Sequence, residues 1–199
     1  MDVIKLKSAV PDRFTDADFL EFCLDHRKLR IERCADGTIT IQQPAYSMMS
    51  ALNAAVSADL ANWNHNTNAG ITFDSSTGFT LPNRVMLSPD TSWIARARWN
   101  ALSPDDRRGF ARICPDFVVE LLSPHRPPPR HYAQNGTLAR GRRAAGARLG
   151  WLIAPGTESV YIFEPGQPVR PVVGFDQELV AGPVLPGFAL ELRRLRVSA

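Results

Sequence analysis

The chain centres on one apolar stretch, residues 115–124, which reads Pro115-Asp116-Phe117-Val118-Val119-Glu120-Leu121-Leu122-Ser123-Pro124. An apolar run with β-branched residues at its centre is typical of a buried strand, and the prolines at its two ends are typical of bounding turns. Glu120 places a carboxylate inside this run, where an unpaired charge is costly. We therefore expect Glu120 to share its site with a cation, an arginine or a metal ion.

The length and composition indicate one globular domain, because 44% of the 199 residues are hydrophobic and such a chain can bury a sizeable core. We expect a flexible N-terminal arm over residues 1–13 and a single domain over 14–199. Neither an apolar signal region nor a run of about 18 apolar residues occurs, so no membrane span is predicted. The three cysteines, Cys23, Cys34 and Cys114, are scattered, which indicates neither a zinc site nor a disulfide framework and favours a cytoplasmic location.

The net charge of +3 comes from one segment. The window His125–Arg148 contains six arginines and no Asp, Glu or Lys, which leaves 23 − 6 = 17 basic residues against 20 acidic ones elsewhere. The remainder of the chain is therefore slightly acidic, and the basic balance says nothing about the whole surface. Because this window is rich in Pro, Gly and Arg and has no apolar period, we treat 125–148 as an atypical part of the domain, for which disorder is one interpretation.

Hydrophobic periodicity predicts helices early and strands late. Thr15 and Asp18 have the spacing of a helix start, and Asp36-Gly37 indicates a hairpin between Leu29–Arg33 and Thr38–Gln42. Further helices are predicted over Tyr46–Asn64, with Met48 and Leu52 on its apolar side, over Arg96–Leu102, and over Pro104–Phe110 after Ser103 as its cap. The other predicted strands are Ile71–Phe73, Phe79–Leu81, Val85–Leu87, Thr91–Ile94, Leu149–Ile153, Val160–Phe163 and Val169–Val173. The pattern is that of an α+β or mixed α/β protein whose sheet is flanked by helices.

Three acids are candidates for chemistry: Glu32, Asp90 and Glu120. If the strands that carry them are neighbours, the carboxylates can converge and hold a hard cation such as Mg²⁺ or Mn²⁺. A cation of this kind supports phosphodiester hydrolysis. Simpler interpretations remain open at this point: Asp90 as a turn residue, Glu32 as a solvated or ion-paired side chain, and Glu120 as the partner of an arginine. The sequence has no nucleophile elbow and no Gly-rich phosphate loop.

Several segments together resemble the Uma-two family of restriction endonucleases. Two sets of residues carry the resemblance, one around the early hairpin and one along the later strands: Arg30–Arg33 with Asp36-Gly37, Phe73–Phe79 with Leu81–Asn83, Leu87–Trp93, Cys114–Glu120, Leu149–Ile153 and Leu185–Phe188. The resemblance implies a restriction endonuclease-like core of the PD-(D/E)XK superfamily, with a central mixed β-sheet and helices on both sides. It also implies Mg²⁺-dependent cleavage of DNA, with Asp90 and Glu120 as metal ligands and Glu32 as the upstream acid, and by analogy a homodimer.

The chain departs from this family pattern after the central strand. The family places a lysine at the start of a helix, near position 138, where this chain reads Leu138-Ala139-Arg140-Gly141-Arg142-Arg143. Two compensating frameshifts or heavy drift over His125–Arg148 is one hypothesis for this, which resequencing the gene would test. Loss of the lysine would impair cleavage, on the order of 3 kcal/mol in the barrier, unless an arginine replaces it. The alternative to an active nuclease is an inactive nucleic-acid-binding protein that keeps the fold, and an enzyme acting on a non-nucleic substrate is a third interpretation.

Overall fold

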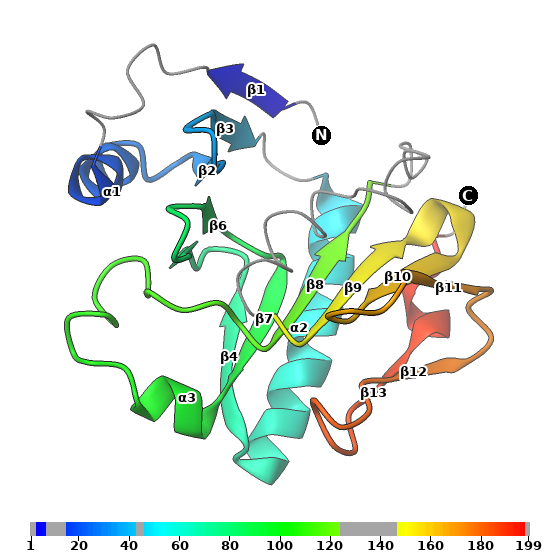
Figure 1. The fold of residues 1–199 in the computed structure, drawn as a ribbon. Helices are drawn as coiled ribbons and strands as arrows, with labels where there is room; N and C mark the ends of the chain where they lie inside the picture. The colour runs from blue at the N-terminus through cyan, green and yellow to red at the C-terminus, as the bar shows by residue number, and fades with distance from the viewer. Residues whose placement is uncertain (1–2, 7–14, 43–45, 124–146, 198–199) are drawn as a thin grey trace.

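The structure, a computed structural model, describes residues 3–6, 15–42, 46–123 and 147–197. Two β-sheets and one long helix dominate it (Figure 1). Among the helices in these ranges, none is long and apolar enough to cross a membrane. The sequence windows 124–146 and 43–45, which include most of the arginine-rich segment and Pro44, lie outside the described residues.

The larger sheet has six strands in the order β11-β10-β9-β8-β7-β4. Strands β8 and β9 run parallel, whereas the other neighbouring pairs are antiparallel, so the sheet is mixed as expected. The stretch with which the sequence analysis began forms β8, fourth in this order. The strands are β4 (Gly70–Asp74), β7 (Thr91–Ala95), β8 (Phe117–Leu121), β9 (Leu149–Ala154), β10 (Ser159–Phe163) and β11 (Arg170–Val173).

The long helix α2 (Ser47–Thr67) covers one face of this sheet together with the C-terminal segment. Helix α2 buries Met49, Leu52, Val56 and Leu60 at helical spacing, and Phe188 of the C-terminal segment stacks on Trp151 of β9 with ring centroids 6.0 Å apart. The C-terminal segment contains β12 (Glu178–Val180), β13 (Ala189–Glu191) and the 3₁₀ turn η4 (Leu192–Leu195). A further 3₁₀ turn, η3 (Pro155–Thr157), joins β9 to β10, and these two strands pair as an antiparallel hairpin.

The smaller sheet has the order β1-β3-β2-β6-β5 and is built on the predicted Asp36-Gly37 hairpin, in which Gly37 has the positive φ of 78° that such a turn requires. Strand β1 lies within the segment expected to be a flexible arm, and its backbone pairs with β3. The predicted cap of α1 (Asp16–Asp25) is present, with reciprocal bonds between Thr15 and Asp18. The strands are β1 (Val3–Leu6), β2 (Arg30–Arg33), β3 (Ile39–Gln42), β5 (Phe79–Thr80) and β6 (Met86–Leu87).

Two details of the predicted helices are wrong. The helix α3 (Arg96–Asn100) forms, but the segment 104–110 consists of turns. Ser103 Oγ does accept the N–H of Asp106, as at a helix cap, and donates to the carboxylate of Asp106. Gly109 then takes a positive φ of 61°, which ends any regular helix. In α2, Met48 is 46% exposed and its neighbour Met49 is buried, because the apolar stripe starts one residue later than predicted.

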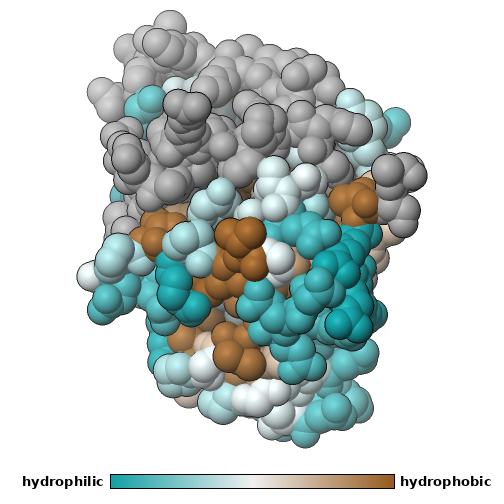
Figure 2. All heavy atoms as spheres, turned by 90° about the vertical axis from the view of Figure 1, so that its right-hand side faces the viewer, coloured by the Kyte–Doolittle hydropathy of each residue, from teal (hydrophilic) through white to brown (hydrophobic). Residues whose placement is uncertain are grey.

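The face that carries the C-terminal strands has a mixed surface. Figure 2 shows hydrophilic residues surrounding a small hydrophobic group on this side of the molecule. The exposed valines Val173 of β11 and Val180 of β12 belong to this part of the chain. Scattered apolar side chains of this kind are normal on a protein surface and do not by themselves mark a binding site.

Candidate active site

The pairing of β7 with β8 brings Asp90 and Glu120 to one end of the larger sheet. The antiparallel register pairs Thr91 with Val119 and Ser92 with Val118, so its extension by one residue sets Asp90 opposite Glu120. Opposed residues of an antiparallel pair lie on the same face. Thr91, next in the chain, forms a hydrogen bond with Ser57 of α2 and so lies on the face that α2 covers. Because side chains alternate along a strand, Asp90 and its opposite residue Glu120 lie on the face turned away from α2.

Asp90 is held rigidly at this position. Its side chain is 13% exposed, and its Oδ2 accepts the backbone N–H of Leu121 at 2.8 Å, just beyond the last residue pair of the two strands. Its Oδ1 accepts a hydrogen bond from Nη1 of Arg30 at 2.8 Å. Both carboxylate oxygens are thus oriented by β8 and by the smaller sheet.

The smaller sheet contributes Arg30 and Glu32, which lie on one face of β2 because Ile31 and Arg33, which alternate with them, are buried on the other. Oε1 of Glu32 accepts the N–H of Ser88 at 2.8 Å, and Arg30 donates to the carbonyl of the same residue. Residues 88–90 link β6 of one sheet to β7 of the other. The two β2 side chains therefore clamp the link that positions Asp90.

The electrostatic centre of the site is the guanidinium of Arg30. Burial by itself would lower the pKa of Arg30, but the negative charges of Asp90, Glu120 and Glu32 outweigh it and hold that pKa above its ordinary value. Counted over the residues that the structure describes, three carboxylates and one guanidinium carry a formal charge of −2. The structure thus brings all three predicted acids to a common arginine.

The donor chemistry of this cluster fits a divalent cation. Its ligand atoms are carboxylate oxygens, as Mg²⁺ and Mn²⁺ prefer, and a dication would balance the formal charge. Within the described ranges, however, no three His, Cys, Asp or Glu side chains are arranged so that they could hold a metal ion together. The guanidinium of Arg30 lies among the acids and is bonded to Asp90.

Sequence reasoning missed two residues of this region. Arg30 could have been found from the two-residue repeat of its strand, which puts it beside Glu32. Asp116, which directly precedes β8, is fully buried; its Oδ2 accepts the N–H of Ala95 at 2.8 Å and its Oδ1 lies 2.9 Å from Nη1 of Arg98. Its position before a strand does not reveal such a partner. The predicted place of the family lysine, near Leu138, lies outside the described residues.

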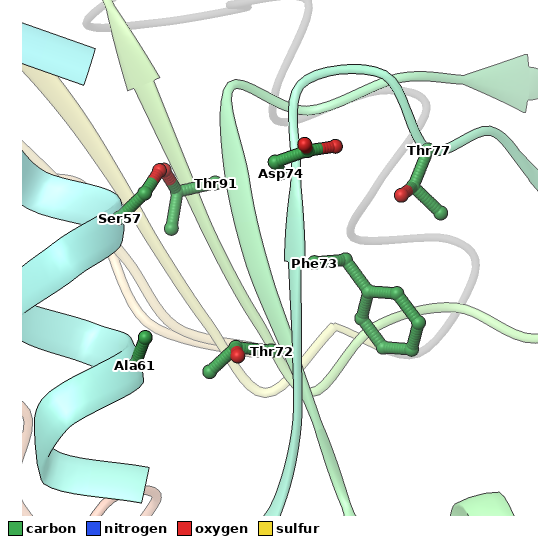
Figure 3. A pocket seen from close by; sticks show the side chains of 7 residues that line it. All are labelled: Ser57, Ala61, Thr72, Phe73, Asp74, Thr77 and Thr91. Carbon is green, nitrogen blue, oxygen red and sulfur yellow. The ribbon is translucent and has the colours of Figure 1, made fainter. Parts of the chain in front are cut away.

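Other reactive groups of the described chain offer no competing centre. Burial raises the pKa of the Cys23 thiol to about 11, so that thiol is not a nucleophile at neutral pH. A hollow of about 390 Å³ with a mixed lining lies between α2 and the edge strand β4; Ala61 and Phe73 line it together with several hydroxyls and the carboxylate of Asp74 (Figure 3). Asp74 accepts two bonds from Ser76 within its own turn, so this carboxylate stabilises the chain locally.

Comparisons with known proteins agree with this architecture. The profile of the Uma2 family, described as "Putative restriction endonuclease", matches residues 16–193. Among solved structures, a protein from Anabaena variabilis ATCC 29413, entitled a putative nuclease belonging to DUF820, superposes with a TM-score of 0.66 at 20% identity; the match covers 83% of this chain and 88% of that one. At that identity the likeness shows a shared fold. No curated protein matched the sequence.

Proposed function

The chain belongs to the Uma2 family, and on that premise we propose that it is a Mg²⁺- or Mn²⁺-dependent endonuclease that hydrolyses DNA phosphodiester bonds at the cluster of Asp90, Glu120, Glu32 and Arg30. Family and fold both point to a nuclease. The observation that supports the position of the site is the electrostatic one: three carboxylates from two sheets surround one guanidinium.

Asp90 and Glu120 are the residues that would hold the cation. When bound, a divalent cation supplies an activated water and neutralises charge that develops on the phosphate. Asp90 presents its carboxylate in a fixed orientation because Leu121 N–H holds Oδ2. Glu32 does not need to bind the cation to matter, since its bond to Ser88 N–H fixes the link that carries Asp90. This arrangement supports the orienting role for the upstream acid.

The test is cleavage of supercoiled plasmid DNA with Mg²⁺ or Mn²⁺, with EDTA as the metal-free control. We expect Asp90→Asn and Glu120→Gln each to lower the cleavage rate at least about a hundredfold, since changes even in outer-shell partners cost that much at metal sites. Asp105→Asn is the matched control, because that side chain is 87% exposed and, within the described ranges, pairs locally with Arg108. Equal loss in all three variants would contradict the assignment of the site.

A second candidate is an inactive nucleic-acid-binding protein that keeps the nuclease fold. The absence of a lysine from Leu138–Arg143 favours it. Wild-type protein that binds DNA with a strong salt dependence, but does not cleave it with either metal, would support this candidate. A homodimer that cuts both strands and a cytoplasmic location remain predictions.

A further inference from the structure

The two arginines of β2 are bonded in very different ways. Arg33, on the buried face, places all three nitrogens on acceptors: Nε on the carbonyl of Arg84, Nη1 on that of Thr15 and Nη2 on the carboxylate of Asp16. Arg30, three positions earlier and on the other face of the strand, uses two nitrogens on Asp90 and Ser88. Its Nε is buried without a hydrogen-bond partner in the described part of the chain.

This difference shows what holds Arg30 in place. A buried donor without an acceptor costs free energy, so hydrogen bonding alone does not account for the placement of Arg30. Charge does: Arg30 interacts electrostatically with Asp90, Glu120 and Glu32 at once. Like charges gathered in a partly buried site repel, and one central cation offsets that repulsion.

Arg30 also occupies the carboxylate oxygen that a metal ion needs. Oδ2 of Asp90 is already bonded to Leu121 N–H, and Nη1 of Arg30 lies 2.8 Å from Oδ1. Mg²⁺ and Mn²⁺ take oxygen ligands at close range and in strict geometry. A cation bound to Oδ1 would therefore lie close to the guanidinium, and the two positive charges would repel each other.

We propose that Arg30 is a positioning residue that takes the place of the divalent cation in the metal-free protein: it gathers the three carboxylates, and a metal ion displaces it from Asp90. This inference rests on the proposed function, because it concerns the same cluster. The charge of Arg30 also affects how strongly a metal ion binds. With Arg30 present, the described residues of the cluster have a formal charge of −2, which one dication neutralises. Removal of the arginine charge leaves −3 and strengthens metal binding.

The experiment measures Mn²⁺ affinity of the full chain in the absence of DNA, by the electron paramagnetic resonance signal of free Mn²⁺. We expect Arg30→Gln to bind Mn²⁺ roughly tenfold more tightly than wild type, the size expected from one unit charge a few ångströms from a dication under solvent screening. The double variant Arg30→Gln/Glu32→Gln restores a formal −2 and keeps an oxygen for Ser88 N–H. The Mn²⁺ affinity of the double variant should return to within about twofold of wild type. The double variant also removes one of the mutually repelling carboxylates, so it serves as the test protein if Arg30→Gln alone does not fold.

Arg33→Gln is the matched control, because it makes the same substitution on the same strand but on the face turned away from the acids. If the role of Arg30 were purely structural, its loss would loosen the carboxylates and Arg30→Gln would bind Mn²⁺ more weakly. A weaker or unchanged Mn²⁺ affinity of Arg30→Gln overturns the inference. If the wild-type protein cleaves DNA and binds Mn²⁺, but Arg30→Gln shows no gain in Mn²⁺ affinity, this inference is overturned and the proposed function is not. Absence of Mn²⁺ binding in every variant would overturn the proposed function with it.

Discussion

Strand β8 has an acidic residue near each end, and the two ends balance their charge in opposite ways. At the start, Asp116 is fully buried and has two arginines, with Nη1 of Arg98 at 2.9 Å and Nη1 of Arg148 at 4.0 Å from its Oδ1. At the other end, Glu120 shares one guanidinium, that of Arg30, with Asp90 and Glu32. Among the described residues, one acid with two arginines has a net formal charge of +1, whereas three acids with one arginine have a net formal charge of −2.

The difference separates an acid that stabilises the fold from acids that form a site. Arg98 and Arg148 are 38% and 53% exposed, so their charges are solvated on one side while Asp116 is not. Asp116 also accepts from Ala95 N–H, and its backbone bonds to Trp93, Arg148 and Leu149 join β7, β8 and β9. Asp116 thus has more cationic than anionic charge beside it, whereas the three acids at the other end share the single guanidinium of Arg30 among the residues that the structure describes.

The largest expected difference between the two ends is in stability. We expect Asp116→Ala to lower the free energy of unfolding by about 3 kcal/mol, because the N–H of Ala95 loses its acceptor and Arg98 loses its fully buried ion-pair partner. Asp90→Ala should change it by less than about 1 kcal/mol, since the lost bonds to Leu121 and Arg30 are offset by weaker repulsion among the remaining acids. Urea unfolding of both variants measures this, and similar losses in the two would remove the distinction between the ends of β8.

A smaller effect is expected at Glu32, whose role in the cluster is to hold the link between the sheets. Glu32→Ala leaves the N–H of Ser88, a residue only 6% exposed, without this acceptor, and should cost about 1 kcal/mol of unfolding free energy. Glu32→Gln keeps a side-chain oxygen at that position and is the control. If urea unfolding shows the two variants equally destabilised, then the charge of Glu32 matters for stability and its hydrogen bond does not.

The sequence was sufficient where structure is local. Asp36-Gly37 identifies the hairpin, Thr15 with Asp18 identifies the start of α1, and the apolar run around Val118 identifies β8, since each depends on a few neighbouring residues. The mistaken helix over 104–110 had a genuine cap at Ser103. A cap cannot sustain a helix when the residues beyond it are held in turns by other contacts, such as the bond from Arg112 N–H to the Asp106 carbonyl.

The site was predictable only in part, because its geometry is non-local. The sequence pointed to Glu32, Asp90 and Glu120, and acids in apolar or turn segments are visible in any sequence. It could not show that β7 and β8 pair in the register that opposes Asp90 and Glu120, nor that β2 of a second sheet presents Arg30 to them. For the same reason the two arginines of Asp116 were not foreseen. Strand order and register decide which charges meet, and residue type alone does not.

The smallest expected effect concerns a third charge cluster, at the surface, where acids and arginines are evenly matched. Arg196 binds both Asp176 and Glu158, with contacts of 2.8 and 3.0 Å, and Nε of Arg193 lies 3.6 Å from Asp176. The side-chain bonds from Arg196 hold the pKa of Glu158 and the pKa of Asp176 below their ordinary values, and the N–H of Phe175 adds to the effect at Glu158. A carboxyl whose pKa is lowered by folding stabilises the fold above its unfolded pKa, about 4, and this stabilisation is lost as the pH falls through the folded value.

Arg196→Gln should therefore reduce stability slightly at neutral pH, and the difference from wild type should shrink as the pH falls through the lowered folded pKa values of Glu158 and Asp176, where the stabilisation is lost. The urea midpoint of wild type should fall more steeply between pH 5 and pH 3 than that of the variant, by a small margin because exposed pairs are screened by solvent. Arg194→Gln, which removes the neighbouring pair with Asp59 and leaves this cluster intact, should keep the steeper fall of wild type. Parallel curves for wild type and Arg196→Gln would show that this balanced cluster adds no measurable stability, unlike the buried acid at the start of β8.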